Sequence, residues 1–173
     1  MAVENIKSNA VTNRDATPKV LNNSWIQGGQ LIEAVGICEA AAAASSASTY
    51  HFCQVPSNAR ISQVLLSSDD HGTTGLIDIG VYKSTLDGGT VVDADFFASA
   101  VDIKTAALAN SDITYEADAA DAAAGFGLSD SEKPLWQALG LTSDPKITYD
   151  IVGTLTEASL SGGTLVLKVR YVL

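Results

Sequence analysis

Two neighbouring segments, residues 60–66 and 76–82, have the sequence pattern of β-strands with one buried face. Apolar side chains, many of them β-branched, alternate with polar ones in both segments, and this is the period of a strand rather than of a helix. The polar run Ser67–Gly72 between them consists of residues that tolerate turns. We therefore expect an antiparallel pair, and the alternation limits the chain to folds built from half-buried sheets.

The rest of the chain adds further strand patterns and one helix pattern. Strands are expected at residues 31–38, 50–55, 91–92, 101–103, 146–156 and 164–172. The first is apolar enough to be covered on both faces, and the last two predict a closing hairpin. Residues 131–139, with Pro134 early and Gly140 after the end, predict a helix of about two turns. About eight strands and one short helix predict an all-β fold, either an antiparallel β-sandwich or a jelly-roll-like barrel.

The first 29 residues are polar, rich in Asn and without a sustained hydrophobic period. We expect residues 1–29 to form an extended N-terminal arm and residues 30–173 to form a single domain. Trp25 and Ile26 either pin the arm to its own domain, which is the favoured interpretation, or anchor it in a neighbouring molecule. Residues 106–130 have the composition of a long loop, and loops of this length are usually functional or mobile.

Charge and composition narrow the classes of partner. Twenty Asp and Glu against ten Lys and Arg give a net charge of −10, which repels both phosphate backbones and anionic lipid. No nucleic-acid or membrane partner is therefore expected, and neither a secretory signal nor a transmembrane stretch is recognisable. The chain is expected to remain in the cytosol unless it leaves within a larger particle. Cys38 and Cys53 are expected in the core, with a disulfide between neighbouring strands as the alternative.

The sequence lacks the motifs that carry enzyme chemistry. Walker, GxGxxG, HExxH and GxSxG patterns are all absent. His51 is expected to pack within its strand, and His71 to be exposed in its loop. The run Asp69-Asp70-His71 could offer oxygen ligands to Ca²⁺, but it lacks the EF-hand spacing and is expected to be a solvated turn. We expect no enzyme activity, no metal and no cofactor.

Four segments carry a resemblance to a known family: VPSNARIS (55–62), IDIGVYKS followed by DGGTVVDADFFASAV (77–101), KPLWQALGLTSDPKITYDI (133–151) and GTLVLKVRYV (163–172). Through these segments, residues 28–173 resemble the capsid decoration or cement proteins of tailed bacteriophages, which are head structural proteins. The resemblance implies a small β-sandwich or jelly roll that sits on the outer surface of a capsid and binds the major capsid protein. It transfers no catalytic residue to this chain.

The expected function is therefore that of a virion structural protein, assembled in the host cytoplasm, which cements neighbouring major capsid protein subunits. The alternative is a β-sandwich binding module, such as a carbohydrate-binding or receptor-binding head or fibre domain. Self-association is also expected, as a trimer rather than a dimer, because the arm could be exchanged between subunits. The candidate contact residues are Arg14, Trp25 and Ile26 in the arm, Asp69, Asp70 and His71 in the turn, and Tyr115 and Phe126 in the long loop.

Overall fold

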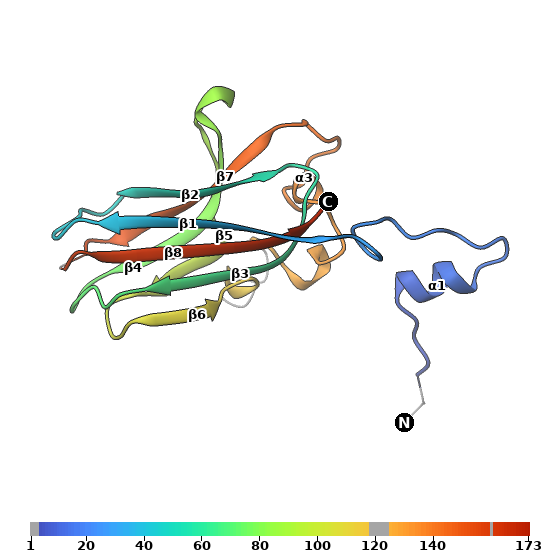
Figure 1. Cartoon of the computed structure of the whole chain (residues 1–173), viewed down its shortest axis with the longest axis horizontal. Coiled ribbons are helices and arrows are strands. Elements are labelled where there is room, and N and C mark those ends of the chain that lie inside the picture. Colours follow the sequence, from blue (N-terminus) through green and yellow to red (C-terminus); the bar gives the residue numbers. More distant parts are fainter. Residues whose placement is uncertain (1–3, 118–124, 160) are drawn as a thin grey trace.

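The chain forms two four-stranded sheets packed face to face, and an N-terminal segment extends away from one end of them (Figure 1). A computed structural model describes residues 4–117, 125–159 and 161–173. The helical elements are α1 (Asn9–Asp15), η1 (Thr85–Asp87), η2 (Leu128–Asp130) and α3 (Leu135–Ala138). The strands are β1 (Leu31–Ala40), β2 (Thr49–Pro56), β3 (Arg60–Ser68), β4 (Leu76–Lys83), β5 (Val91–Asp102), β6 (Leu108–Asp112), β7 (Thr148–Glu157) and β8 (Gly163–Val172).

The strands pair in a nested order. One sheet has the order β1-β8-β3-β6 and the other β2-β7-β4-β5, and every pair is antiparallel. The first strand thus lies beside the eighth, the second beside the seventh, the third beside the sixth and the fourth beside the fifth. The predicted all-β antiparallel sandwich is confirmed.

Two predicted strand pairs are wrong, although all four strands exist. β3 and β4 lie in different sheets, and so do β7 and β8. Each short connection between them carries the chain across the sandwich instead of turning back within one sheet. Alternation of apolar and polar residues fixes which face of a strand is buried, but it does not say which strand lies alongside. Neighbours in sequence pair often, though not always.

The core between the sheets consists mainly of Val, Ile and Leu, with one aromatic cluster. Side chains from all eight strands except β6 are buried there, among them Ile61, Ile77 and Leu167. Phe96, Phe97 and Phe126 pack edge-on or tilted, with ring centroids 5.0 to 5.9 Å apart. Such aromatic contacts add to the free energy gained by area burial alone. The cluster closes the core beneath the segment that follows β6.

Strand β1 is an exposed outer strand, so the prediction that both of its faces are covered is wrong. Its odd-numbered residues face solvent and its even-numbered residues turn inward. It pairs with β8 on one side only. On the other side it approaches β2 so closely that a Cβ at Gly36 would lie 2.1 Å from the Phe52 backbone oxygen. Glycine therefore permits the two sheets to close at this corner.

Three smaller predictions also need correction. The helix predicted at residues 131–139 is only the four-residue α3, because Pro134 precedes its first turn in extended conformation. Residues 108–112, which were expected to be part of a loop, form β6. Residues 118–124 of that expected loop lie outside the described residues. Residues 91–102 form one continuous strand, β5, with several irregularities in its pairing with β4.

Candidate partner-binding interface at the arm end

The N-terminal segment, residues 4–30, is held in shape by polar contacts. Ser8 caps α1 through its side chain, and Lys7 forms an ion pair with Asp15 at 2.9 Å. The following segment folds back on the helix, because the Asn13 side chain donates to Asn22 Oδ1 at 2.8 Å and Val20 N donates to Asn13 O at 3.1 Å. The segment thus has defined conformation, and we refer to residues 4–30 as the arm.

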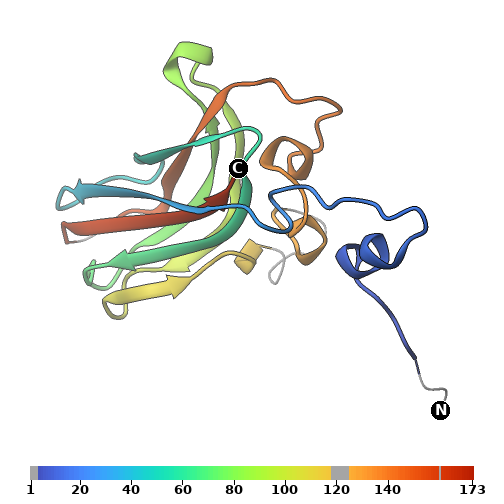
Figure 2. The ribbon, with the colours of Figure 1, turned by 45° about the vertical axis from the view of Figure 1, so that its right-hand side comes forward.

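No residue of the arm is buried. The side chains of Ile6, Leu21 and Val20 are 82%, 85% and 49% exposed, whereas Val11 and Ile26 are half-buried. Figure 2 shows that α1 and the loop after it stand clear of the sandwich. Burial of apolar area is the main favourable term in protein folding and association. The arm therefore offers apolar area that its own domain does not cover.

The base of the arm is attached to the sandwich at one arginine. Arg60 Nε donates to the backbone oxygen of Trp25 at 2.6 Å, and Arg60 Nη1 donates to Ser131 O at 3.3 Å. A further contact runs from the Asn9 side chain to Glu132 Oε2 at 2.8 Å. Trp25 and Ile26 are half-buried at this junction. Each of these two side chains is therefore partly covered by its own chain and partly open to solvent.

Arg14, another predicted contact residue, lies on α1 with its side chain 62% exposed. Its Nε is 2.8 Å from Asp15 Oδ1. Hydrogen bonds from Arg14 and Lys7 lower the pKa of Asp15, and the hydrogen bond to Asp15 raises the pKa of Arg14. The arm thus presents Asp15, paired with both Lys7 and Arg14, beside its exposed apolar side chains.

Tyr115 and Phe126 lie at the same end of the sandwich as the arm, but only Tyr115 reaches the surface. Their rings stack at 5.7 Å with an angle of 12° between the planes. Phe126 is fully buried, so its place is in the core and not at the surface, where a partner contact would need it. Tyr115 is half-buried, and its hydroxyl lies 2.9 Å from Oγ of Ser131, the residue whose backbone oxygen accepts from Arg60.

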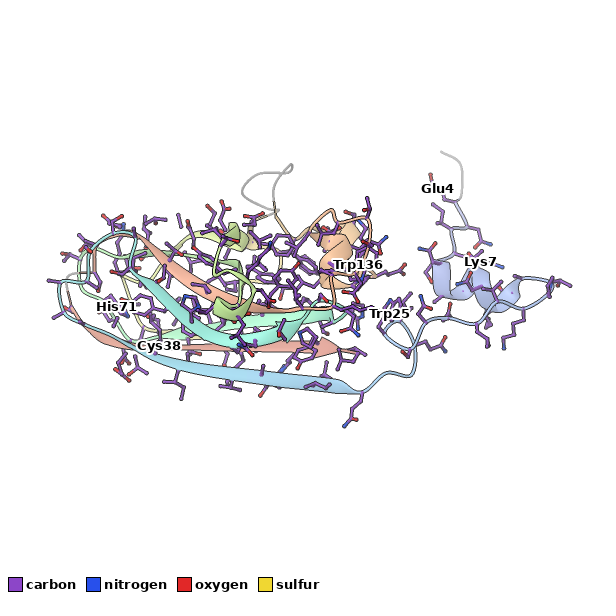
Figure 3. All side chains as sticks on the ribbon, turned by 90° about the horizontal axis from the view of Figure 1, so that it is seen from above. Glu4, Lys7, Trp25, Cys38, His71 and Trp136 are labelled. Carbon is purple, nitrogen blue, oxygen red and sulfur yellow. The ribbon has the colours of Figure 1, made fainter. Side chains whose placement is uncertain are left out.

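The turn Asp69-Asp70-His71 lies at the other end of the sandwich. Figure 3 shows His71 far from Trp25 and Trp136, which mark the arm end. Asp69 accepts a hydrogen bond from Thr164 N at 2.9 Å, and this bond lowers its pKa. Asp70 accepts from Gly72 N at 2.8 Å within the turn. The predicted contact residues therefore fall into two groups at opposite ends, and a single flat surface could not contact both.

His71 is buried, so the prediction of an exposed histidine in this turn is wrong. Its Nδ1 lies 2.9 Å from Ser159 Oγ, and Ser159 Oγ donates to Ser161 O at 2.5 Å. Because the hydroxyl proton is used in that second bond, Nδ1 must be the donor of the first. The ring joins the β3–β4 connection to the β7–β8 connection. Its structural role is to hold these two connections together.

His51, in contrast, is half-exposed and not packed within its strand as predicted. Its Nδ1 is 3.0 Å from Asp150 Oδ2, and Cys53 follows on the same face of β2. A Cys, a His and an Asp could suggest a nucleophile with its base. However, burial and the nearby Asp150 raise the pKa of Cys53 to about 12, so the thiol does not ionise at neutral pH. Both cysteines are free thiols and half-buried.

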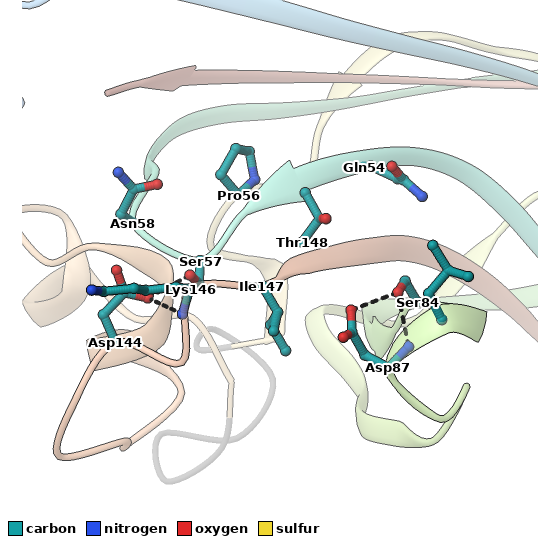
Figure 4. A pocket seen from close by; sticks show the side chains of 11 residues that line it. Gln54, Pro56, Ser57, Asn58, Ser84, Asp87, Asp144, Lys146, Ile147 and Thr148 are labelled. Carbon is teal, nitrogen blue, oxygen red and sulfur yellow. Dashed lines mark hydrogen bonds between the residues drawn. The ribbon is translucent and has the colours of Figure 1, made fainter.

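A surface groove lies between the β2–β3 turn, the η1 loop and the residues before β7 (Figure 4). Its volume is about 630 Å³. Asp144 on one side accepts from Ser57 Oγ and from Lys146 N, and these bonds lower its pKa. Asp87 on the other side accepts from Ser84 Oγ at 2.7 Å. Asp87 thus serves its own turn, and Asp144 joins the segment before β7 to the β2–β3 turn. No sequence pattern predicts this groove.

The described residues contain no group of three or more His, Cys, Asp or Glu placed to hold a metal ion. Nor is any helix in the described part of the chain long and apolar enough to cross a membrane. The alternative of a carbohydrate-binding module would need exposed aromatic rings. Of the eleven Phe, Tyr and Trp residues, seven are buried and four are half-buried, so no aromatic platform is available on the surface.

No protein-family model matches the chain, and no curated protein matches its sequence. Among solved structures, the chain is similar to a chain of the Cyanophage Pam1 capsid asymmetric unit, with a TM-score of 0.53 and 19% sequence identity. The similarity covers 84% of this chain and 86% of that one. It shows that the two chains share a fold over most of their length.

Proposed function

We propose that this protein is a structural component of a phage virion, which binds the outer surface of the capsid through its arm end. There it holds neighbouring major capsid protein subunits together. The observation that carries the proposal is the arm, which has a defined shape, no buried residue and several exposed aliphatic side chains.

The energetics of the arm favour a partner. Fixing the backbone of one residue costs about 1–2 kcal/mol of conformational entropy. In the sandwich this cost is offset by burial of apolar area, but in the arm it is offset mainly by polar contacts, because no residue there is more than partly buried. Burying Ile6, Val20 and Leu21 against a capsid subunit would add about 25 cal/mol for each Å² of apolar area. An arm of this kind is therefore suited to bind another molecule.

The geometry also suits a cement role. The arm leaves the sandwich at Gln30 and reaches well beyond it (Figure 1). At its base Trp25 is half-buried, and exposed Leu128 accepts a hydrogen bond from Ser131, which also binds Arg60. A protein that contacts one subunit with its base and a second with its arm links the two, and the second contact gains from its high effective concentration.

Charge supports the choice of partner class. Residues 1–30 hold three Lys and Arg against two Asp and Glu, whereas residues 31–173 hold seven against eighteen. An acidic sandwich is repelled by nucleic acid, so we propose protein contacts only, with the packaged genome excluded. The fold shared with a chain of a phage capsid asymmetric unit supports the virion as the location.

The proposal is tested by binding to capsids that lack this protein. The full chain is compared with a form that lacks residues 1–22 and with the double variant Ile6→Ser/Leu21→Ser. We expect both altered forms to lose at least tenfold in affinity, measured as occupancy by cryo-electron microscopy or co-sedimentation. We also expect capsids bearing the full chain to withstand higher temperatures than bare ones.

The matched control is Leu86→Ser, which removes a leucine that is 98% exposed at the η1 tip, outside the arm end. It should bind capsids as well as the unaltered chain does. Equal occupancy for the arm variants and the unaltered chain would contradict the role of the arm. Failure of the full chain to bind any capsid surface would contradict the function itself.

A further inference from the structure

The solvent face of β1 carries a row of exposed aliphatic side chains that the fold does not need. Leu31, Val35 and Ile37 are 57%, 50% and 66% exposed, and they alternate with residues that pack against the core, such as Ile32 and Ala34. Figure 3 shows side chains of β1 projecting outward from the sandwich. The outer face of an antiparallel sheet is ordinarily polar.

The apolar character is confined to one half of this sheet. On the other half Leu65 is buried, and polar side chains form hydrogen bonds: Gln63 Nε2 donates to Asp112 Oδ2 at 2.8 Å, and Ser67 Oγ accepts from Asn110 N at 2.8 Å. Next to β1, the outward residues of β8 are Val166, Lys168 and Arg170. We call the outward residues of β1 and β8 together the β1 face.

The β1 face differs from the rest of the sandwich in charge. It contains Glu33 and Glu39 on β1 and Lys168 and Arg170 on β8, so it is balanced. The remaining residues between 31 and 173 hold five Lys and Arg against sixteen Asp and Glu. Two copies of so acidic a domain repel one another over most approaches, but here the net charge is zero and does not oppose contact.

From this balance we infer that the β1 face is a contact surface for a second copy of this chain. A two-fold axis parallel to the strands places β1 of one copy over β8 of the other. Each residue then faces the residue with which it already pairs within its own sheet, since Glu33 is in register with Arg170 and Ile37 with Val166. Opposite charges meet, and aliphatic side chains meet between them.

The size of the face limits the strength of this contact. Two strands of ten residues each, at about 3.3 Å per residue and with neighbouring strands about 4.8 Å apart, present roughly 320 Å² per copy. A stable complex usually buries about 800 Å² per partner. The contact is therefore weak in solution and forms where copies are held close together. It is a symmetric contact and gives a dimer, in place of the trimer that the arm suggested.

The test is sedimentation velocity of the isolated full chain between about 10 μM and 1 mM, which needs no capsid and is independent of the proposed function. We expect the weight-average mass to rise with concentration toward that of a dimer. Ile37→Lys should keep the mass at the monomer value throughout, while its melting temperature stays unchanged. Leu86→Ser, the control, should associate as the unaltered chain does.

A charge exchange separates the β1 face from other surfaces. Glu33→Arg should weaken association at least tenfold, and the double variant Glu33→Arg/Arg170→Glu should restore it, because the exchanged pair is again complementary across the axis. A chain that stays monomeric at 1 mM would overturn the inference. Association that Ile37→Lys leaves intact would overturn it too, since the contact would then lie elsewhere, and so would a trimeric mass.

Discussion

The arm and the sandwich reach their defined shapes by different means. In the sandwich, seven of the eight strands contribute buried side chains to one core, and hydrogen bonds follow from the sheets. In the arm, between residues 4 and 30, hydrogen bonds and ion pairs are present but buried side chains are not. The sandwich therefore has its own core to stabilise it, whereas the arm has exposed apolar area that a partner could cover. Four measurements test this difference between the arm and the sandwich.

The largest loss of stability is expected from a substitution at Phe126, which lies in the core. Phe126→Ala removes a fully buried ring that touches Phe96, Phe97 and Tyr115. Truncations of this kind lower the free energy of unfolding by about 3–5 kcal/mol. Urea denaturation followed by fluorescence would measure the loss. Leu128→Ala, two residues away and 70% exposed, is the control and should cost less than about 0.5 kcal/mol. A stable Phe126→Ala variant that fails only in capsid binding would restore Phe126 as a contact residue.

A smaller loss is expected at the end of the sandwich opposite to the arm. Ser159→Ala leaves the buried Nδ1–H of His71 without its acceptor, and an unpaired buried donor costs about 1–3 kcal/mol. Thermal unfolding monitored by calorimetry would detect this. Exposed Ser129 is a suitable control, because Ser129→Ala removes a hydroxyl from the surface. Equal melting temperatures for the two variants would mean that the histidine does not hold the two connections together.

Much of the sandwich was predictable because alternation records which face of each strand is buried. The patterns at residues 60–66 and 76–82 became β3 and β4 for this reason. Partner choice was not predictable, since it depends on contacts between residues far apart in sequence. β5 illustrates the limit: four residues between Asp93 and Ala98 lie opposite Gly80 alone, where a Cβ would come within 2.2 Å of Asp93 O. No local sequence pattern predicts such a bulge.

The candidate interface was predictable only in outline. Polar composition marked residues 1–29 as an arm, but it concealed α1, because Asn and Thr are poor helix formers. The sequence predicts the wrong environment for both histidines: His51 is half-exposed instead of packed, and His71 is buried instead of exposed. His71 follows two aspartates and looks solvated, yet its burial depends on Ser159, which is 88 residues distant. The sequence does not predict the β1 face, because an apolar run such as residues 31–38 predicts a strand covered on both sides.

A cluster of carboxylates on β4 and β5 should make the sandwich slightly more stable when one of them is neutralised. Burial, Asp95 and Glu116 raise the pKa of Asp78, and burial and Asp95 raise the pKa of Asp93. A raised pKa in the folded state means that stability is full below the unfolded pKa and falls as pH rises through the folded pKa. Asp95→Asn should therefore raise the melting temperature by about 1–2 °C at pH 7.

The gain from Asp95→Asn should shrink below about pH 4, where carboxyls are mostly protonated. Calorimetric scans at both pH values would measure it. Glu4→Gln, which removes a carboxylate from the arm, should have no such effect. A variant that is less stable than the unaltered chain at pH 7 would show that Asp95 makes a favourable contact outweighing the repulsion.

The smallest effect is expected from removing the arm itself. Deletion of residues 1–22 leaves the bond between Arg60 and Trp25 in place and takes away no buried side chain. The free energy of unfolding should change by less than about 0.5 kcal/mol. The slope of that free energy against urea concentration is the sharper measure, because it scales with the area that unfolding exposes. An arm that covers nothing contributes nothing to this slope, so the shortened and full chains should give the same value. A lower slope for the shortened chain would mean that the arm packs against the sandwich in solution and that its apolar side chains already have a partner.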